Sequence, residues 1–149
     1  FGTYNKSGVS ASQLAIGRAA IVCPVAAEVE NREKYGYPTY RYYYTGNFSN
    51  ISPLPWIGAT HSAELPLIFG THYEYRGNST EYEWQVADGM QSLWLSFAKN
   101  PTKNGIKGDG VTWPLYKPDQ KKMAVLAEAG KKWFQLGPES LTDDQCSKA

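Results

Sequence analysis

An excess of charge of one sign and long apolar runs are both missing from this sequence. Its 15 Lys and Arg residues are matched by 14 Asp and Glu residues, which leaves a formal net charge of +1 at pH 7. Nucleic acids and anionic lipids bind to clustered basic side chains, so we expect neither as a partner. The longest apolar run, residues 19–27, is about half as long as a membrane-spanning helix, so we expect no membrane span.

Cysteine is equally scarce. Cys23 and Cys146 are the only two, and their separation excludes a CxxC redox motif or a zinc knuckle, so we predict no metal site. The pair can form one disulfide in an oxidising compartment, bond elsewhere or remain as buried thiols.

A charged-then-apolar leader is also lacking, so we expect any targeting segment to be absent or already removed. Four N-x-S/T acceptor sequences are present, at Asn5, Asn47, Asn50 and Asn78. Each tripeptide alone is weak evidence, because Asn, Ser and Thr also populate loops. Four in one chain of 149 residues nevertheless favour a secreted glycoprotein.

The first half of the chain has the pattern of a helix followed by a strand. Apolar residues at helical spacing predict a helix over residues 12–33, which Pro24 should end or kink near Val22. Residues 38–45, rich in Tyr and Thr, predict a strand covered on both faces, as in an α/β sheet. The long loop that follows, through Gly58, is of a length that is usually functional or disordered.

The clearest local prediction is a second helix. Thr80 and Glu83 form a capping box, and the apolar residues after them recur at helical spacing as far as Asn100. The closely spaced Gly105, Gly108 and Gly110 predict a loop. It is not a phosphate cradle, because no strand precedes it and no helix with a Lys-Ser/Thr pair follows it.

Three further segments complete the pattern towards the C-terminus. Residues 123–127 predict a late strand, and residues 131–136 a last helical turn. Residues 139–149 are polar and predict a tail.

Only two histidines can supply an imidazole. His72 has polar neighbours, and its expected environment is a solvated loop. His61 lies in an apolar stretch, where a lone histidine is more often structural than catalytic.

The stretch around His61 resembles the histidine loop of the type-B carboxylesterases, the family of cholinesterases and of fungal lipases and esterases. That family's pattern is Trp-x-Gly-x-x-His-Gly-x-Glu, followed by an apolar run ending in Phe-Gly. The matching positions are Trp56, Gly58, His61, Glu64, Phe69 and Gly70, and Ser62 stands where Gly is usual.

Other matches keep the family's order. They are Cys23-Pro24, the helix pattern of Met90, Trp94, Phe97 and Ala98, and the Trp113–Tyr116 segment. The resemblance covers roughly residues 12–136, and the sequence has the character of a fungal enzyme.

This resemblance implies an α/β-hydrolase with a Ser–Glu/Asp–His triad in that chain order. His61 would be the general base, and Glu64 a supporting carboxylate near it. Glu64 is not taken as the triad acid, because the family's acid lies well upstream. The family's cysteine at position 23 bonds to one near the C-terminal helix, and Cys146 lies further along than that partner, so the 23–146 bond is a candidate. The resemblance implies no cofactor.

The nucleophile itself is missing from these 149 residues. No serine has the G-x-S-x-G pattern, and there is no glycine-rich oxyanion segment. We therefore expect residues 1–138 to be the C-terminal portion of a single α/β-hydrolase domain, with 139–149 as its tail. A separate N-terminal chain of the same esterase would supply the serine, the acid and the oxyanion hole, and the substrate would be a small-molecule or lipid ester.

Two alternatives stay open at this point. The first is a catalytically inactive, cholinesterase-like adhesion or binding protein that keeps the histidine without the serine. The second is a secreted carbohydrate-binding module that uses Tyr and Trp as stacking platforms. The second is disfavoured, because such modules show short, evenly spaced strands, whereas this sequence predicts long helices.

Overall fold

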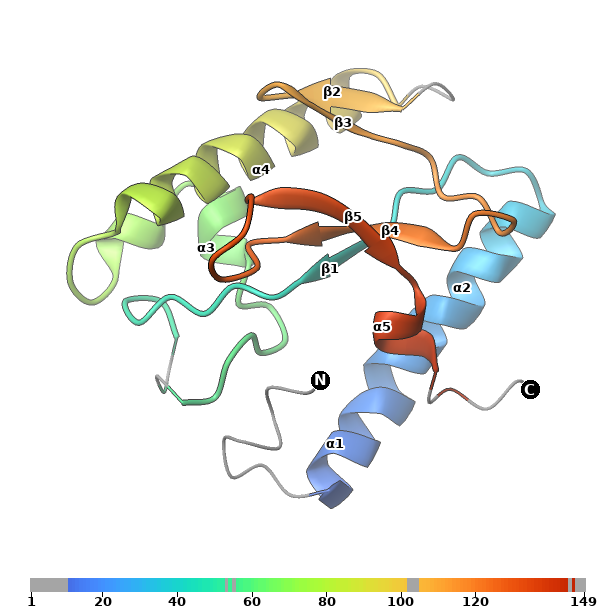
Figure 1. Cartoon of the computed structure of the whole chain (residues 1–149), viewed down its shortest axis with the longest axis horizontal. Helices are drawn as coiled ribbons and strands as arrows, with labels where there is room; N and C mark the ends of the chain where they lie inside the picture. Colours follow the sequence, from blue (N-terminus) through green and yellow to red (C-terminus); the bar gives the residue numbers. More distant parts are fainter. Residues whose placement is uncertain (1–10, 53, 55, 102–104, 145, 147–149) are drawn as a thin grey trace.

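The chain folds into a small mixed sheet with a long helix on each side (Figure 1). The structure is a computed structural model and describes residues 11–52, 54, 56–101, 105–144 and 146. The sheet has the strand order β1-β4-β5. Its strands are β1 (Tyr42–Tyr44), β4 (Lys122–Leu126) and β5 (Phe134–Pro138). Helix α4 (Glu81–Lys99) lies on one side, and the helix formed by the first 24 described residues lies on the other.

The N-terminal helix does not end near Val22, but its geometry changes there. It consists of α1 (Ala11–Gly17), a π-helical segment η2 (Arg18–Val22) and α2 (Cys23–Lys34). Pro24 lies in the first turn of α2. Because proline has no backbone N–H, it cannot donate to a carbonyl of the preceding helical turn. The π-helical segment absorbs this mismatch without ending the helix.

Strand β1 lies in the second half of the predicted strand 38–45 and is shorter than that prediction. Tyr42, Tyr43 and Tyr44 pair in parallel with Ala124, Val125 and Leu126 of β4. Among the described residues, β1 pairs with β4 alone, which leaves its second edge open. Strand β4 lies one residue before the predicted segment 123–127 and is almost fully buried.

The sequence predicted a helical turn at residues 131–136, and this prediction is wrong. Strand β5 occupies the second half of this segment, residues 134–136, and pairs antiparallel with β4, with Phe134 opposite Leu126. The turn between the strands holds Gly130 in the left-handed region, and Ala127 N–H donates to the Trp133 carbonyl at 2.8 Å. Pairing with a buried neighbouring strand therefore overrides the local preference of Lys131 and Lys132 for helix.

The glycine-rich segment is a β-hairpin and not a plain loop. Strands β2 (Ile106–Gly108) and β3 (Val111–Trp113) pair antiparallel around Asp109 and Gly110. Both turn residues have positive φ, +47° and +71°, which is the requirement of a tight two-residue hairpin turn. The Asp-Gly pair was the signal that the sequence prediction missed.

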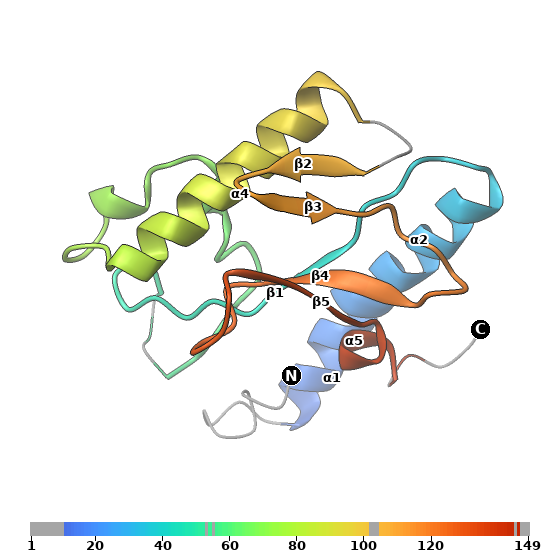
Figure 2. The same cartoon turned by 45° about the horizontal axis from the view of Figure 1, so that its top comes forward.

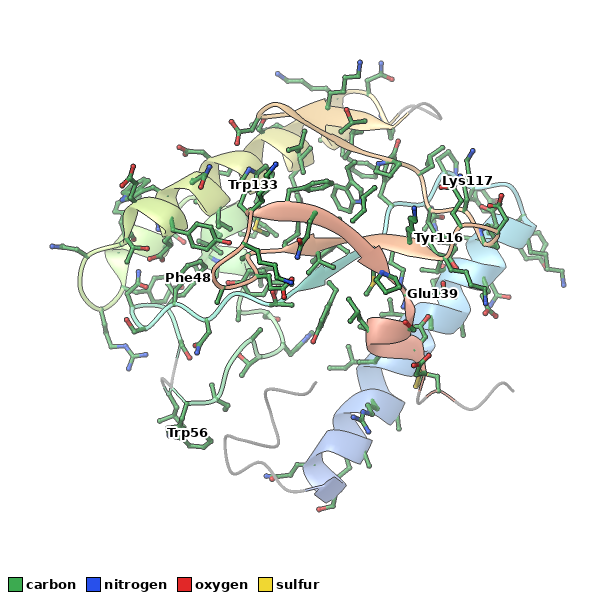
Figure 3. The ribbon with its side chains drawn as sticks, viewed as in Figure 1. Phe48, Trp56, Tyr116, Lys117, Trp133 and Glu139 are labelled. Atoms are coloured by element: carbon green, nitrogen blue, oxygen red, sulfur yellow. A yellow bond between two sulfur atoms is a disulfide. The ribbon has the colours of Figure 1, made fainter. Side chains whose placement is uncertain are left out.

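Helix α4 begins and ends where its sequence pattern predicted. Thr80 is its N-cap, and the Thr80 hydroxyl accepts a hydrogen bond from Glu83 N–H at 3.1 Å. Its apolar face packs on the sheet in one core cluster, in which Trp133 covers Gly89 (Figure 3). The cluster comprises Tyr44, Leu67, Val86, Ala87, Met90, Leu93, Ile106, Trp113, Ala124, Leu126, Ala127 and Trp133.

The described part of segment 139–149 is anchored to the fold. Residues Ser140–Asp143 form a helical turn, α5, and Asp143 accepts hydrogen bonds from both terminal nitrogens of the buried Arg41. Tyr116 hydroxyl donates to Glu139 at 2.6 Å, and the two side chains lie close together in Figure 3. Cys23 and Cys146 form a disulfide across 123 residues. The described residues of this segment are therefore held at several points.

Candidate active site

His61 lies on the long segment between β1 and α4, just before the short helix α3 (Leu65–Ile68). Its side chain is exposed and lines a groove of about 480 Å³. One wall of this groove comes from Ile21 and Val25 of the N-terminal helix, and the floor comes from the tyrosines of β1. His61 forms no hydrogen bond or ion pair with the residues that the structure describes. Its ring is therefore accessible to a group from outside them.

The residue after His61 has an unusual backbone conformation. Ser62 has φ +66°, in the left-handed region that favours glycine. The chain turns sharply here, because Ala63 N–H donates to the Thr60 carbonyl and Leu65 N–H donates to the Ser62 carbonyl. This turn projects His61 from the segment, and it gives a physical reason for the glycine that the family pattern has at position 62.

Glu64 bonds to the sheet and not to His61. Its Oε1 accepts a hydrogen bond from the Tyr42 hydroxyl at 3.0 Å, so the segment after His61 is tied to strand β1. Burial, together with the Glu64 charge and this hydrogen bond, raises the pKa of Tyr42. The phenol therefore stays protonated and remains a donor to the carboxylate at neutral pH.

The sequence predicted that His72 is a solvated loop residue, and this prediction is wrong. It begins the 3₁₀ turn η3 (His72–Glu74) and is completely buried, with its ring 4.5 Å from the ring of Trp84. Its Nδ1 lies 2.7 Å from Ser79 Oγ and 3.3 Å from Glu83 Oε1. The polar neighbours that suggested exposure are folded inwards around the imidazole.

The side-chain amide of Asn50 completes this buried cluster. Asn50 Nδ2 donates to Glu83 Oε1 at 2.8 Å, to the His72 carbonyl at 3.1 Å and to Ser79 Oγ at 3.3 Å. In a catalytic triad the serine and the acid meet opposite nitrogens of the imidazole. Here Ser79 and Glu83 both face Nδ1, so the cluster has the geometry of a structural network.

The four predicted glycosylation sites lie in different surroundings. Asn47 and Asn78 are exposed, whereas Asn50 is 5% exposed and uses its amide nitrogen in the cluster above. A glycan on Asn50 would open that cluster, so the structure favours Asn47 and Asn78 as acceptors. Asn5 lies outside the described residues.

Neither a metal cluster nor a membrane-spanning helix is found in the described part of the chain. No group of three or more His, Cys, Asp or Glu side chains there could hold a metal ion. None of the helices there combines the length and the apolar character that crossing a bilayer requires.

Comparison with known proteins shows the family to which this chain is similar. The model of the carboxylesterase family matches residues 3–142. Chlorogenic acid esterase from Aspergillus niger is 48% identical over 143 residues, which cover 88% of this chain and 28% of that protein. Secreted lipase 5 from Gibberella zeae is 43% identical over 124 residues, covering 82% and 22%. Acetylcholinesterase from Gallus gallus is 30% identical over 111 residues, covering 74% and 14%.

These matches run through the histidine loop, α4 and the strands of the sheet, so they include every element that surrounds His61. The chain spans about a quarter of the length of the two fungal relatives. It belongs to the carboxylesterase family and corresponds to the C-terminal part of a fungal type-B carboxylesterase.

Proposed function

We propose that this chain supplies the general-base histidine of a secreted serine esterase that hydrolyses carboxylic esters. The observation that carries the proposal is the position of His61. It lies within a family motif, on a sharp turn, with its side chain exposed in an apolar groove.

The chemistry assigned to His61 uses both nitrogens of its ring. Nε2 takes the proton of the serine hydroxyl as the oxygen attacks the ester carbonyl, and it returns that proton to the leaving alcohol. A water molecule then repeats the attack on the acyl-enzyme and releases the acid. Nδ1–H donates to the triad carboxylate, which fixes the tautomer. Imidazole suits both steps because its unperturbed pKa lies near neutral pH.

The serine, the triad acid and the oxyanion hole would come from an N-terminal chain of the same esterase. The open edge of β1 supports this, because an unpaired strand edge in a sheet calls for a partner. A second groove, of about 610 Å³, lies between α2, the segment before β1 and the aromatic end of α4. Its lining includes Tyr40, Trp94 and Trp113, an apolar surface that a larger fold would cover.

Secretion and substrate class follow from the same family. The name of secreted lipase 5, the disulfide and the exposed Asn47 and Asn78 support an extracellular glycoprotein. The names of the two fungal relatives, chlorogenic acid esterase and secreted lipase 5, point to esters of chlorogenic acid and of lipids as candidate substrates. Activity should therefore be assayed on an ester of each type.

The proposal is tested by replacing His61 in the complete esterase. We expect His61→Ala to lower kcat by about 10⁴-fold with little change in the unfolding midpoint, as in other triad deletions. Lys99→Ala, at the far end of α4, is the control and should keep its activity. A His61→Ala variant with more than a tenth of the wild-type kcat would exclude His61 as the base. A wild-type protein with no esterase activity would favour the inactive binding protein instead.

A further inference from the structure

The segment that carries His61 is a loop closed at its base. Asn50 and His72 flank residues 51–71, and the Asn50 amide donates to the His72 carbonyl at 3.1 Å. Arg76 N–H donates back to the Asn50 carbonyl at 3.3 Å, and the Arg76 guanidinium binds the Ser52 carbonyl. The two ends of the segment are therefore joined to each other, and these contacts form its base.

The base is fixed to α4 by a buried polar cluster, which we call the clamp: Asn50, His72, Ser79 and Glu83. Glu83 is its centre, since its carboxylate is 1% exposed, accepts from Asn50 and lies 3.3 Å from His72 Nδ1. Its backbone lies in the first turn of α4, which Thr80 caps. A rigid 19-residue helix therefore sets the position of the loop base.

Glu83 depends on the other members of the clamp for its hydrogen bonds, because its side chain is shielded from water. A buried carboxylate loses its hydration, and only its hydrogen-bond partners compensate for that loss. If one partner leaves, the remaining charge is poorly satisfied, and the cheapest response is to let water into the base. The loop ends would then separate.

Packing transmits the base geometry to His61. Ala59 and Ala63, on either side of His61, pack against the core, and Leu67 of α3 is completely buried against it. Tyr44 of β1 lines the same groove as His61, and burial together with the charges of Glu64 and Glu83 raises the pKa of its phenol. Tyr44 is therefore near both the loop that carries His61 and the clamp.

We propose that Glu83 and Asn50 are positioning residues for His61: through the clamp they hold the base of loop 51–71 and so aim the imidazole at the serine. The inference rests on the proposed function for its catalytic consequence. Its structural part, the order of the loop, has a separate readout.

The first test uses Glu83→Gln in the complete esterase, with Glu81→Gln as the matched control. Both changes remove one carboxylate from the first turn of α4, but Glu81 is exposed. We expect Glu83→Gln to lower kcat by about 10- to 100-fold, with KM within twofold, because displacements of about 1 Å cost up to about 100-fold. Glu81→Gln should keep the wild-type kcat.

A second variant removes the other half of the clamp. Asn50→Ala opens the loop base and should lower kcat in the same way. Because it also removes an acceptor sequence, Asn47→Gln is its control: that change removes an exposed acceptor sequence and keeps the Asn50 amide. In the Asn50→Ala, Glu83→Gln double variant the losses should not add, since both act through one network.

The readout independent of activity is hydrogen exchange at the Ala63 and Leu65 amides, which the turns of the loop protect. We expect faster exchange there in Glu83→Gln than in Glu81→Gln. Unchanged exchange and a kcat within twofold of wild type in Glu83→Gln would overturn the inference. If the wild-type protein hydrolyses no ester, the proposed function fails, and the exchange experiment alone decides on the clamp.

Discussion

At Ser62 the backbone conformation explains a residue preference of the family. The family pattern has glycine there, and the structure explains why: the backbone at this position has φ +66°. A side chain in the left-handed region costs about 1–2 kcal/mol. The cost persists here because the turn that projects His61 requires it.

Ser62→Gly should therefore stabilise the complete protein by about 0.5–1 kcal/mol, since glycine relieves the strain but loses some conformational entropy on folding. Activity should be kept. The control is Gly58→Ala in the same loop. Gly58 has φ +75° with open space around its Cβ position, so this variant should be destabilised by about 1 kcal/mol. Thermal unfolding midpoints measure both, and a lower midpoint for Ser62→Gly would contradict the assignment of strain.

The residues of the site were predictable only where a motif named them. His61 and Glu64 were found through the histidine-loop pattern. Local patterns explained the other three residues in a different way. Asn50 was part of an acceptor sequence, His72 was expected to be solvated, and Glu83 was half of a capping box. Their common burial depends on contacts across 22 and 33 residues of sequence, which no local pattern encodes.

At the scale of elements, local sequence signals determine where helix α4 begins and ends, whereas the conformation of strand β5 depends on pairing with a distant segment. Helix α4 was predicted almost to the residue, because the Thr80 cap and the apolar spacing act within the helix itself. The first three residues of strand β5 were predicted as part of a helical turn, because the conformation of the strand depends on its pairing with β4. The β2–β3 hairpin was missed although Asp109-Gly110 is a local turn signal.

Two glycines on helices separate helix propensity from packing. Glycine to alanine stabilises an ordinary helix by about 0.5–1 kcal/mol. Gly17→Ala should follow this rule, since its backbone is helical and nothing lies within 4 Å of a new Cβ. In Gly89→Ala the Cβ would meet the Trp133 ring at 2.5 Å, so we expect a net loss of about 1–3 kcal/mol. Opposite shifts in the unfolding midpoint are the expected result, and a stabilised Gly89→Ala would refute the packing of Trp133 on α4.

The anchored C-terminal segment predicts a dependence of stability on pH. Burial alone would raise the pKa of Asp143, but hydrogen bonds from Arg41 and Thr142 and the Arg41 charge lower it below its ordinary value. A lowered carboxyl pKa stabilises the fold above the unfolded pKa of about 4, and this contribution is lost as the pH falls through the folded value.

Asp143→Asn should thus cost about 2 kcal/mol of unfolding free energy at pH 7. The difference from wild type should shrink as the pH falls below about 4. Its neighbour Asp144 is exposed, so Asp144→Asn should leave the pH profile unchanged. Denaturant titrations between pH 2 and 8 measure this, and a constant difference across that range would argue against the Arg41–Asp143 pair as its source.

At the scale of the whole molecule, the chain has more apolar surface than its own sheet can cover. It contains five Trp, eleven Tyr and five Phe residues, and Trp56 is 53% exposed at the edge of the molecule (Figure 3). Within the described part of the chain, the three-stranded sheet keeps an open edge at β1, with the N-terminal helix and α4 at its sides (Figure 2). The unit of function that we propose is therefore this chain together with the part that holds the serine.

The most direct test of that unit is labelling of the complete protein with a fluorophosphonate, which reacts with an activated serine. The account predicts one labelled serine, in a peptide outside these 149 residues, and loss of labelling in His61→Ala. Labelling of a serine within this chain, equal labelling in His61→Ala or the absence of any labelled serine would contradict it.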